Sequence, residues 1–324
     1  MKKRYVLLGI LILYGFLFVF PNTIVGEQRY VVLLQGESTS ISGYISEDTT
    51  WTVAGSPYII VGGVIVNPGA ILTIESGVVV RFTAGTNLVI DGGLIAQGNA
   101  TNRIMFTSNA TAPAPGDWAG ILIRSSGFCN VASSVIKYAT CGINFDHPET
   151  SAFTQSRVTS NVVGIEIFGH RVRLEGLTIE NNTDCGIYGN TGYIPIRNSM
   201  ISKNNIGIKG NGASANINNC TISNNTLDGI YSGWIMHIDG IWDSHIVNNG
   251  GWGINIGARL RNCRDTTISN NSGGGVYVYN YWSAEIYSCN ITNNNGHGVF
   301  SSGEWGGGVT ITGSIISNNR NYGV

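Results

Sequence analysis

A short motif returns along the chain at a nearly constant interval. Glycine followed by isoleucine or valine recurs at steps of 21 to 25 residues, often a few residues after Asn-Asn. A steady period of roughly 20 to 50 residues is typical of solenoids, in which each repeat packs only against its neighbours. The chain is therefore expected to fold as a stack of coils. These glycine pairs begin at residues 142, 164, 186, 207, 229, 253, 275, 298 and 323.

Each repeat divides into three short segments with the composition of β-strands. The first follows the glycine (GIEI at 164–167), the second alternates apolar and polar residues (VRLE at 172–175), and the third is a TIS-type segment that runs into Asn-Asn. Leucine-rich repeats share this period, but residues 155–324 contain only four leucines and show no helical periodicity. The pattern predicts an all-β fold: a parallel β-helix with three strands per coil, about 22 residues per coil and roughly twelve coils.

The recurring NN-x-x-G-I motif is expected to form a corner of each coil. Asparagine tolerates the left-handed backbone conformation that a sharp corner requires, and its amide can bond to the same amide one coil away. The glycine is expected to restart the strand at a positive φ. Isoleucine and valine should fill the inward positions, because branched side chains stack well on pleated strands.

The first 26 residues have the features of an export signal. A basic start at residues 2–4 precedes a 16-residue apolar run over residues 5–20, which is short for a membrane span of about 20 residues. Residues 1–26 are therefore expected to be a signal peptide or an N-terminal membrane anchor. Either one places the rest of the chain outside the cytoplasm, secreted or at the cell surface.

The two ends of the predicted solenoid differ. Residues 27–50 are expected to form an N-terminal cap over the first coil, and residues 51–324 to form the β-helix itself. An open end exposes unpaired backbone and core side chains. No capping segment precedes the last residue, Val324. We therefore expect a continuation of the chain or another subunit to cover the last coil.

Charge and cysteine usage exclude several functions. The formal net charge is −1 with 11% charged residues and no basic run, so nucleic acid is not an expected partner. The six cysteines lack the C-x-x-C spacing of metal sites, and no metal or other cofactor is predicted. Cys263 and Cys289 occupy similar places in adjacent coils, one strand spacing apart, and form the candidate disulfide.

The segment at 56–108 and the Asn-Asn/Gly-Ile coils resemble the right-handed parallel β-helix of pectin-lyase-like proteins. Within that family they are most similar to the NosD-like carbohydrate-binding and sugar-hydrolase repeat group. The resemblance covers roughly residues 51–324 and implies a right-handed, single-stranded β-helix. Members of this fold include lyases, hydrolases, copper-centre accessory proteins and surface scaffolds, so the resemblance alone does not select a function.

Polygalacturonases of this fold carry Asn-Thr-Asp, Asp-Asp, Gly-His-Gly and Arg-x-Lys motifs. This chain has the first as residues 182–184 and the third as residues 296–298, but no Asp-Asp. The two motifs are about five coils apart, roughly 24 Å along the axis. Inverting hydrolysis needs carboxyl groups about 6.5–9.5 Å apart. Residues 182–184 are therefore interpreted as one instance of the repeated corner.

Charged residues gather on the second strand of three successive coils. If the apolar residues of these strands point inward, period-two alternation turns two columns outward. One is expected to run through His237, Arg259 and Glu285 and the other through Asp239 and Arg261. The simplest interpretation is a solvated ladder of ion pairs. Because lyases of this fold use Arg or Lys beside acidic residues that often bind calcium, the alternative is a catalytic face. Calcium is expected only under that alternative. The charged candidates are His237, Asp239, Arg259, Arg261 and Glu285.

Aromatic residues recur at the outward position after Gly-Ile and in the loops that follow. A row of exposed rings suits stacking on sugar rings, and a large exposed apolar surface usually contacts something. Burial of the rings under loops is the structural alternative. The candidate ligand-binding residues are Tyr188, Tyr231, Trp234, Tyr277, Trp282, Phe300 and Trp305.

Three functions fit these observations. The first is non-catalytic binding of a polysaccharide or a cell-surface glycan or partner along the aromatic side. The second is a polysaccharide lyase or glycoside hydrolase that uses the charged face. The third is a NosD-like accessory protein or a structural spacer without a ligand.

Overall fold

The computed structural model describes residues 19–24, 27–32, 38–169, 172–233, 236–279, 283–302 and 308–324. It contains two compact units, residues 1–37 and residues 38–324. In the first unit, β1 (Val19–Ile24) pairs with β2 (Glu27–Val32) in antiparallel fashion. The predicted signal peptide or anchor lies mostly outside the described residues. Across the described part of the chain, no helix has the length and apolar character to cross a membrane.

The second unit is a parallel β-helix whose strands form three rows, here called A, B and C in chain order. Strands β3 (Thr39–Ile45) and β5 (Tyr58–Val66) each run through rows A and B, and a short 3₁₀ turn η1 (Val53–Gly55) precedes β5. Row A contains β7 (Val79–Phe82), β10 (Ile104–Ser108), β13 (Ser134–Lys137), β16 (Arg157–Thr159), β19 (Thr178–Glu180), β22 (Met200–Ser202), β25 (Thr221–Ser223), β28 (His245–Val247), β31 (Thr267–Ser269), β34 (Asn290–Thr292) and β37 (Ile315–Ser317).

Rows B and C complete each coil. Row B contains β8 (Asn87–Ile90), β11 (Trp118–Ile123), β14 (Ala139–Asp146), β17 (Val163–Phe168), β20 (Cys185–Asn190), β23 (Ile206–Asn211), β26 (Ile230–Ser232), β29 (Trp252–Ile256), β32 (Gly274–Tyr279) and β35 (Val299–Ser302). Row C contains β4 (Thr49–Trp51), β6 (Ile71–Ile74), β9 (Gly93–Gln97), β12 (Phe128–Ala132), β15 (Ser151–Thr154), β18 (Val172–Glu175), β21 (Tyr193–Arg197), β24 (Ser214–Asn218), β27 (His237–Trp242), β30 (Leu260–Arg264), β33 (Ala284–Tyr287) and β36 (Val309–Thr312).

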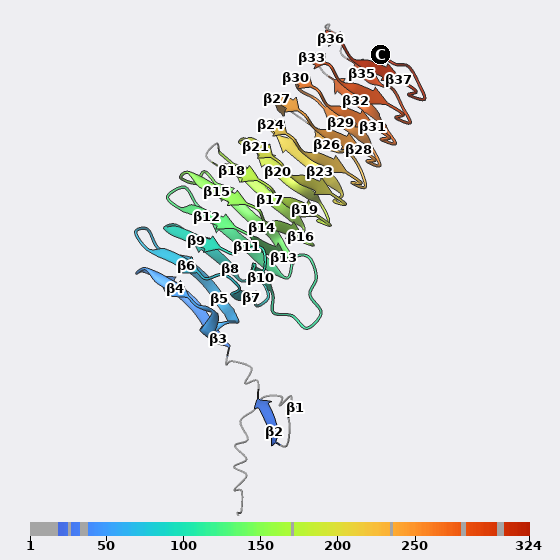
Figure 1. The fold of residues 1–324 in the computed structure, drawn as a ribbon. Helices are drawn as coiled ribbons and strands as arrows, with labels where there is room; N and C mark the ends of the chain where they lie inside the picture. Colours follow the sequence, from blue (N-terminus) through green and yellow to red (C-terminus); the bar gives the residue numbers. More distant parts are fainter. Residues whose placement is uncertain are drawn as a thin grey trace, which may run out of the picture. The chain divides into compact units, whose positions relative to one another are not determined.

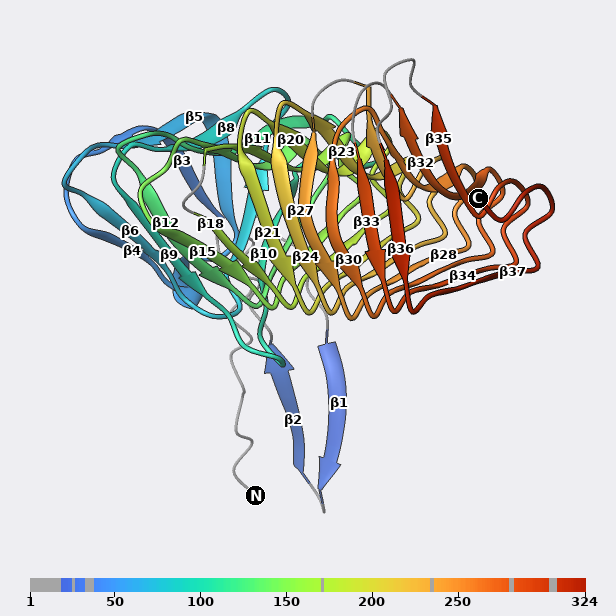
Figure 2. The same cartoon turned by 90° about the horizontal axis from the view of Figure 1, so that it is seen from above.

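The coils stack in sequence order, from β3 at one end to β37 at the other (Figure 1). Row C alone forms a 12-stranded parallel sheet, one strand from each coil, and rows A and B together form a sheet of 23 strands. Figure 2 shows the rows separately: β27, β30, β33 and β36 lie side by side, apart from β28, β34 and β37. The predicted all-β fold with about twelve three-stranded coils is confirmed.

The predicted boundary between cap and β-helix needs a correction. Residues 39–50 were expected to belong to a cap, but β3 pairs in parallel with β5, and β4 pairs in parallel with β6. These segments therefore belong to the first coil. The physical reason is that Ile41 and Ile45 pack against the core and Trp51 is buried in it, as the inward residues of later coils are.

The core is a set of stacked branched side chains, one column for each row. In row B, Ile165, Ile187, Ile208 and Ile230 lie opposite one another in successive coils and are fully buried. Row A has a similar column through Ile179 and its counterparts. Larger rings such as Trp118 and Phe106 fill the wider first coils. The expectation of inward Ile and Val is confirmed.

The two residues of the Asn-Asn corner have different structural roles. The first has a left-handed backbone, with φ between 56° and 59° at Asn181, Asn224 and their counterparts, and Ser160 and Lys203 take the same place in two coils. The second is buried, and its amide donates to the same amide one coil away at 2.8–3.2 Å. This second set, called here the asparagine ladder, consists of Asn161, Asn182, Asn204, Asn225, Asn249, Asn271, Asn294 and Asn319.

The corner glycine has a different role from the predicted one. Gly186 and its counterparts do not have a positive φ. A Cβ on Gly186 would instead lie 2.8 Å from the carbonyl oxygen of Gly207 and 2.9 Å from the Asn204 amide nitrogen. The motif therefore needs glycine because the next coil approaches too closely for any side chain, and the prediction of a positive φ was wrong.

A second ladder marks the corner between rows C and A. The Ser156 hydroxyl accepts from the backbone N–H of Ser134 at 3.0 Å and donates to the Thr154 carbonyl at 2.7 Å. Cys220 stands at the equivalent position, with its sulfur 3.2 Å from the Asn218 carbonyl oxygen. Buried thiols thus replace hydroxyls in some coils.

Replacing a central member of the asparagine ladder should destabilise the fold. In Asn204→Ala, the amide and the backbone N–H of Asn182 would both lose their acceptor in the buried corner. Because each unsatisfied buried group costs about 1–3 kcal/mol, we expect a loss of roughly 2–6 kcal/mol in unfolding free energy. Guanidinium titration followed by circular dichroism measures this loss.

The neighbouring variant Asn205→Ala is the matched control. Asn205 is half-buried, and its described hydrogen bonds involve only its backbone N–H and carbonyl groups. We expect a change within about 0.5 kcal/mol, as is usual for surface substitutions. Equal unfolding midpoints for the two variants would show that the ladder does not stabilise the coil.

Candidate functional site

One outward column runs along row B and carries most of the predicted aromatic residues. Strand pairing places its members directly opposite one another in successive coils. The predicted register of this column is therefore confirmed. In chain order it consists of Asn144, Glu166, Tyr188, Lys209, Tyr231, Asn255, Tyr277 and Phe300.

The C-terminal half of the column is the centre of a continuous group of rings. The Tyr277 ring lies 5.2 Å, centroid to centroid, from each of three rings, those of Trp252, Tyr279 and Phe300. Phe300 in turn stacks on His297 at 4.8 Å. Phe300 is 37% exposed. These five residues, Trp252, Tyr277, Tyr279, His297 and Phe300, are called here the aromatic cluster.

Local backbone features hold Trp252 in this cluster. Its backbone N–H donates to the Asp228 carboxylate at 2.6 Å. The same carboxylate accepts from the Asn255 amide at 2.9 Å. The Trp252 ring lies against Gly274, where an added Cβ would come within 2.3 Å of it. Burial raises the pKa of Asp228, although these hydrogen bonds oppose the shift.

Tyr279 closes the cluster on the side toward row C. Its hydroxyl donates to the carbonyl oxygen of Ser232, two coils away. Burial raises the pKa of the Tyr279 phenol, and the nearby Tyr231, Tyr277 and Asp228 raise it further. The phenol therefore stays protonated at neutral pH and serves as a fixed hydrogen-bond donor.

The other half of the column is polar. Lys209 Nζ lies 3.1 and 3.2 Å from the two oxygens of Asp184, and 5.9 Å from the Tyr188 ring centroid. Burial opposes the charge of Lys209, but its contact with Asp184 leaves the pKa raised. The Asp184 of the Asn-Thr-Asp segment is therefore an ion-pair partner at the corner.

Three predicted ligand-binding residues lie outside the described residues. Trp234, Trp282 and Trp305 follow strands β26, β32 and β35 in the chain. Sequence analysis did not select Trp252 or Tyr279, which the structure adds to the cluster. Tyr279 lies two residues after the outward Tyr277, so period-two alternation of row B is the signal that identifies it. Trp252 directly precedes the corner Gly253, three residues before the outward Asn255, and alternation does not identify it.

The charged face of row C has a different register from the predicted one. The pairing of β24 with β27 shifts after Ala215, so Asn216 lies opposite Gly240 and His237 lies opposite Ser214. A second shift follows Leu260 in the pairing of β30 with β33. The cause is the coil around β27, which is two residues longer than the coil before it. The column predicted through Asp239 and Arg261 was therefore wrong and consists instead of Asn218, Trp242, Arg264, Tyr287 and Thr312.

Two of the charged candidates still meet. Arg259 Nη2 lies 3.1 Å from Glu285 Oε1, and both side chains are about one-third exposed. His237 and Asp239 lie on the adjacent strand β27 and are half-buried, whereas Arg261 is exposed. The contact between Arg259 and Glu285 is the ion pair expected under the simplest interpretation of this face. Among the described residues, no three His, Cys, Asp or Glu side chains gather as metal ligands.

The candidate disulfide residues are close together but reduced in the structure. The sulfur atoms of Cys263 and Cys289 lie 3.6 Å apart in the buried core of adjacent coils. A disulfide requires a separation of about 2.05 Å, so the two sulfurs are in contact but not bonded.

The strand pairing defines the class of the fold as a parallel β-helix. Residues 43–145 match the family described as the pectate-lyase like beta helix domain. No curated protein gives a significant sequence match.

Three solved structures illustrate the similarity. A point mutant of the periplasmic alginate epimerase AlgG matches with 14% identity and a TM-score of 0.62, over 86% of this chain and 83% of its own. AlgG itself matches with 17% identity and a TM-score of 0.48, over 86% and 82%. The alginate lyase from Paenibacillus sp. str. FPU-7 matches with 15% identity and a TM-score of 0.35, over 79% and 91%. At these identities, the likeness shows the fold alone.

Mild oxidation should join Cys263 to Cys289. We expect the accessible thiol count of the denatured protein to fall by two, and peptide mapping to recover one linked pair. The variant Cys141→Ser is the control, because Cys141 lies in row B and should leave the linkage unchanged. A full thiol count after oxidation would contradict this prediction.

Proposed function

We propose that the chain binds a linear polysaccharide along the outward column of row B, with the aromatic cluster as the main contact. The observation that carries the proposal is the continuous contact of partly exposed rings about one strand spacing apart. Stacked side chains at such spacing present apolar faces to successive sugar rings. The adjoining polar residues of the column supply hydrogen-bond partners for hydroxyl groups.

The geometry favours binding over catalysis at this surface. Asp228 accepts two hydrogen bonds from within the protein, and the Tyr279 phenol donates to a backbone carbonyl. These groups are engaged in holding the rings in place. The charged face of row C supports the catalytic alternative less well, because Arg259 is paired with Glu285. We propose an extracytoplasmic location, supported by the export features of residues 1–26 and by the similarity to a periplasmic enzyme.

Affinity electrophoresis through gels with embedded polysaccharides tests the proposal. Alginate is the first acidic polymer to include, because the AlgG match acts on it, and a neutral glucan is the second. We expect the purified chain to be retarded, and the double variant Tyr277→Ala/Phe300→Ala to lose this retardation. Each stacked ring contributes about 0.5–1.5 kcal/mol, so the loss of two weakens binding roughly 5- to 150-fold.

Tyr44→Ala is the matched control, because Tyr44 is 73% exposed at the other end of the β-helix. It should bind as the unmodified chain does. Equal retardation of all variants at equal unfolding midpoints would reject the aromatic cluster as the binding site. Cleared polymer around the band would identify an enzyme, and Arg259→Gln would then show whether the charged face is responsible. No retardation in any gel would favour an accessory protein or spacer.

A further inference from the structure

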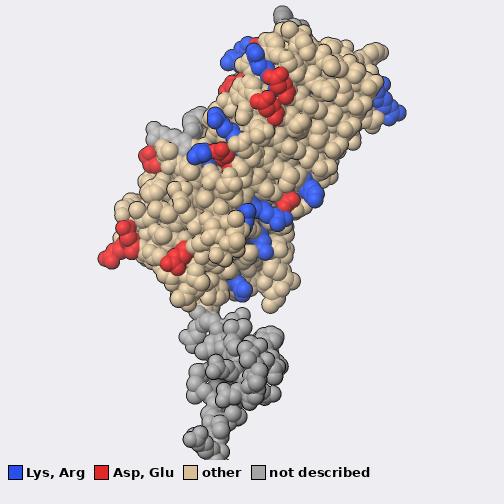
Figure 3. All heavy atoms as spheres, viewed as in Figure 1, with Lys and Arg blue, Asp and Glu red and all other residues tan. Residues whose placement is uncertain are grey.

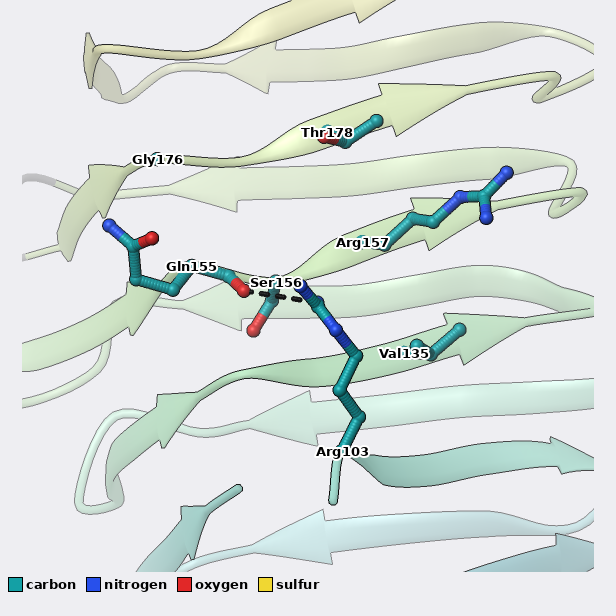
Figure 4. A pocket seen from close by; sticks show the side chains of 7 residues that line it. All are labelled: Arg103, Val135, Gln155, Ser156, Arg157, Gly176 and Thr178. Carbon is teal, nitrogen blue, oxygen red and sulfur yellow. Dashed lines mark hydrogen bonds between the residues drawn. The ribbon is translucent and has the colours of Figure 1, made fainter. Parts of the chain in front are cut away.

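A hollow of about 280 Å³ opens on the outer face of row A, in the coils of β10 to β19. Val135, Arg157 and Thr178 are opposite one another on adjacent strands and form one wall. Arg103, from the turn before β10, and Gln155, from the turn between β15 and β16, form the other (Figure 4). The hollow is on a different row and different coils from the aromatic cluster.

Arg103 reaches across β13 to the turn that carries Gln155 (Figure 4). There its Nη1 donates to the Gln155 carbonyl oxygen at 3.2 Å. Among the described residues, no carboxylate pairs with Arg103. Arg157 instead runs along its own strand to Glu180, with Nη2 2.5 Å from Oε1. Arg103 therefore brings an uncompensated positive charge and several N–H donors to the hollow, because a guanidinium has five.

The surroundings increase this positive charge. Lys and Arg side chains gather over β13 and β16 (Figure 3). Arg81 of β7 lies opposite Thr107 of β10, and Lys137 is the last residue of β13, which pairs with the other side of β10. The nearby Asp117 is engaged within its own loop, where it accepts from the Ser108 hydroxyl at 2.7 Å. In a chain with only 11% charged residues, this is a concentrated basic patch.

Two neutral donors complete the hollow. The Gln155 amide lies against Gly176, where an added Cβ would come within 2.4 Å of its nitrogen, so the glycine makes room for it. The Thr178 hydroxyl lies at the far side, one strand beyond Arg157. In the part of the chain that the structure describes, neither group has a hydrogen-bond partner.

The hydrogen-bond donors of the hollow are the Arg103 guanidinium, the Gln155 amide and the Thr178 hydroxyl, and they come from separate coils. A planar carboxylate is matched by a single guanidinium fork, whereas a tetrahedral oxyanion has acceptor oxygens in several directions. The volume of about 280 Å³ is just below the range for drug-sized ligand sites, about 300–1,000 Å³, and suits a small group. We propose that this hollow binds a sulfate or phosphate ester group carried by a sugar or polyol, with Arg103 as the principal contact. This site does not depend on glycan binding at the aromatic cluster.

Isothermal titration calorimetry on the purified full chain tests the proposal. The probes are a glucose sulfate ester, a glucose phosphate ester, inorganic sulfate, inorganic phosphate, glucuronate and glucose, all at one ionic strength. We expect one of the esters to bind with saturation, and Arg103→Gln to weaken it at least tenfold. Thr178→Val, which removes a hydroxyl without changing the charge, should weaken it several-fold.

Arg197→Gln is the matched control, because Arg197 is an exposed arginine in β21 of row C and the charge change is identical. It should bind the ester as the unmodified chain does. The ester that binds more tightly identifies the source of the oxyanion, and either result supports the proposal. Glucuronate or inorganic ions binding as tightly as the esters would overturn it. Unchanged affinity in Arg103→Gln at an equal unfolding midpoint would also overturn it.

Discussion

The stacking of identical amides at one corner is the interaction on which the rest of the structure depends. Each ladder amide donates to the next amide and also to a backbone carbonyl, so a buried polar group is satisfied in every coil. A one-residue slip would leave these groups unpaired in an apolar interior, at a cost of about 1–3 kcal/mol each. The corner therefore fixes the register of rows A and B, because both strands leave from it.

A fixed register has a direct consequence for the surface. Side chains that follow the corner glycine by two residues must lie one above another, about one strand spacing apart. Where two such side chains in adjacent coils are aromatic, their rings come into contact, as Tyr277 and Phe300 do at 5.2 Å between ring centroids. Among the described residues, the corner after row C has one amide pair, Asn219 donating to Asn198 at 2.8 Å, and no buried ladder of amides. In row C a coil of different length is absorbed by shifts in strand pairing. Binding surfaces therefore form more readily on the row that the ladder controls.

The sequence predicts the parts of this molecule that the repeat dictates. The coil number, the strand rows and the outward column of row B follow from the spacing of the Gly-Ile pairs alone. The column through Asp239 and Arg261 could not be predicted, because period-two alternation does not say where a longer coil places its extra residues. The role of the corner glycine was also hidden, because a close approach between coils and a positive φ both require the absence of a side chain. The basic hollow could not be predicted from the repeat. Arg103 lies 54 residues before Arg157 and belongs to an irregular coil that precedes the regular repeat.

Substitutions on one face of the β-helix can therefore change that face with little effect on the others. Each outward side chain belongs to a column set by its own row, and substitutions on row A leave the inward columns and the amide ladder unchanged. The corner residues allow no such freedom, since Gly186 and Asn204 are confined by the coil above. A β-helix of this kind combines an interior that repeats from coil to coil with surfaces that differ from row to row. This separation between rows allows chemically different surfaces on one β-helix. Here they are the aromatic cluster on row B and the uncompensated Arg103 on row A.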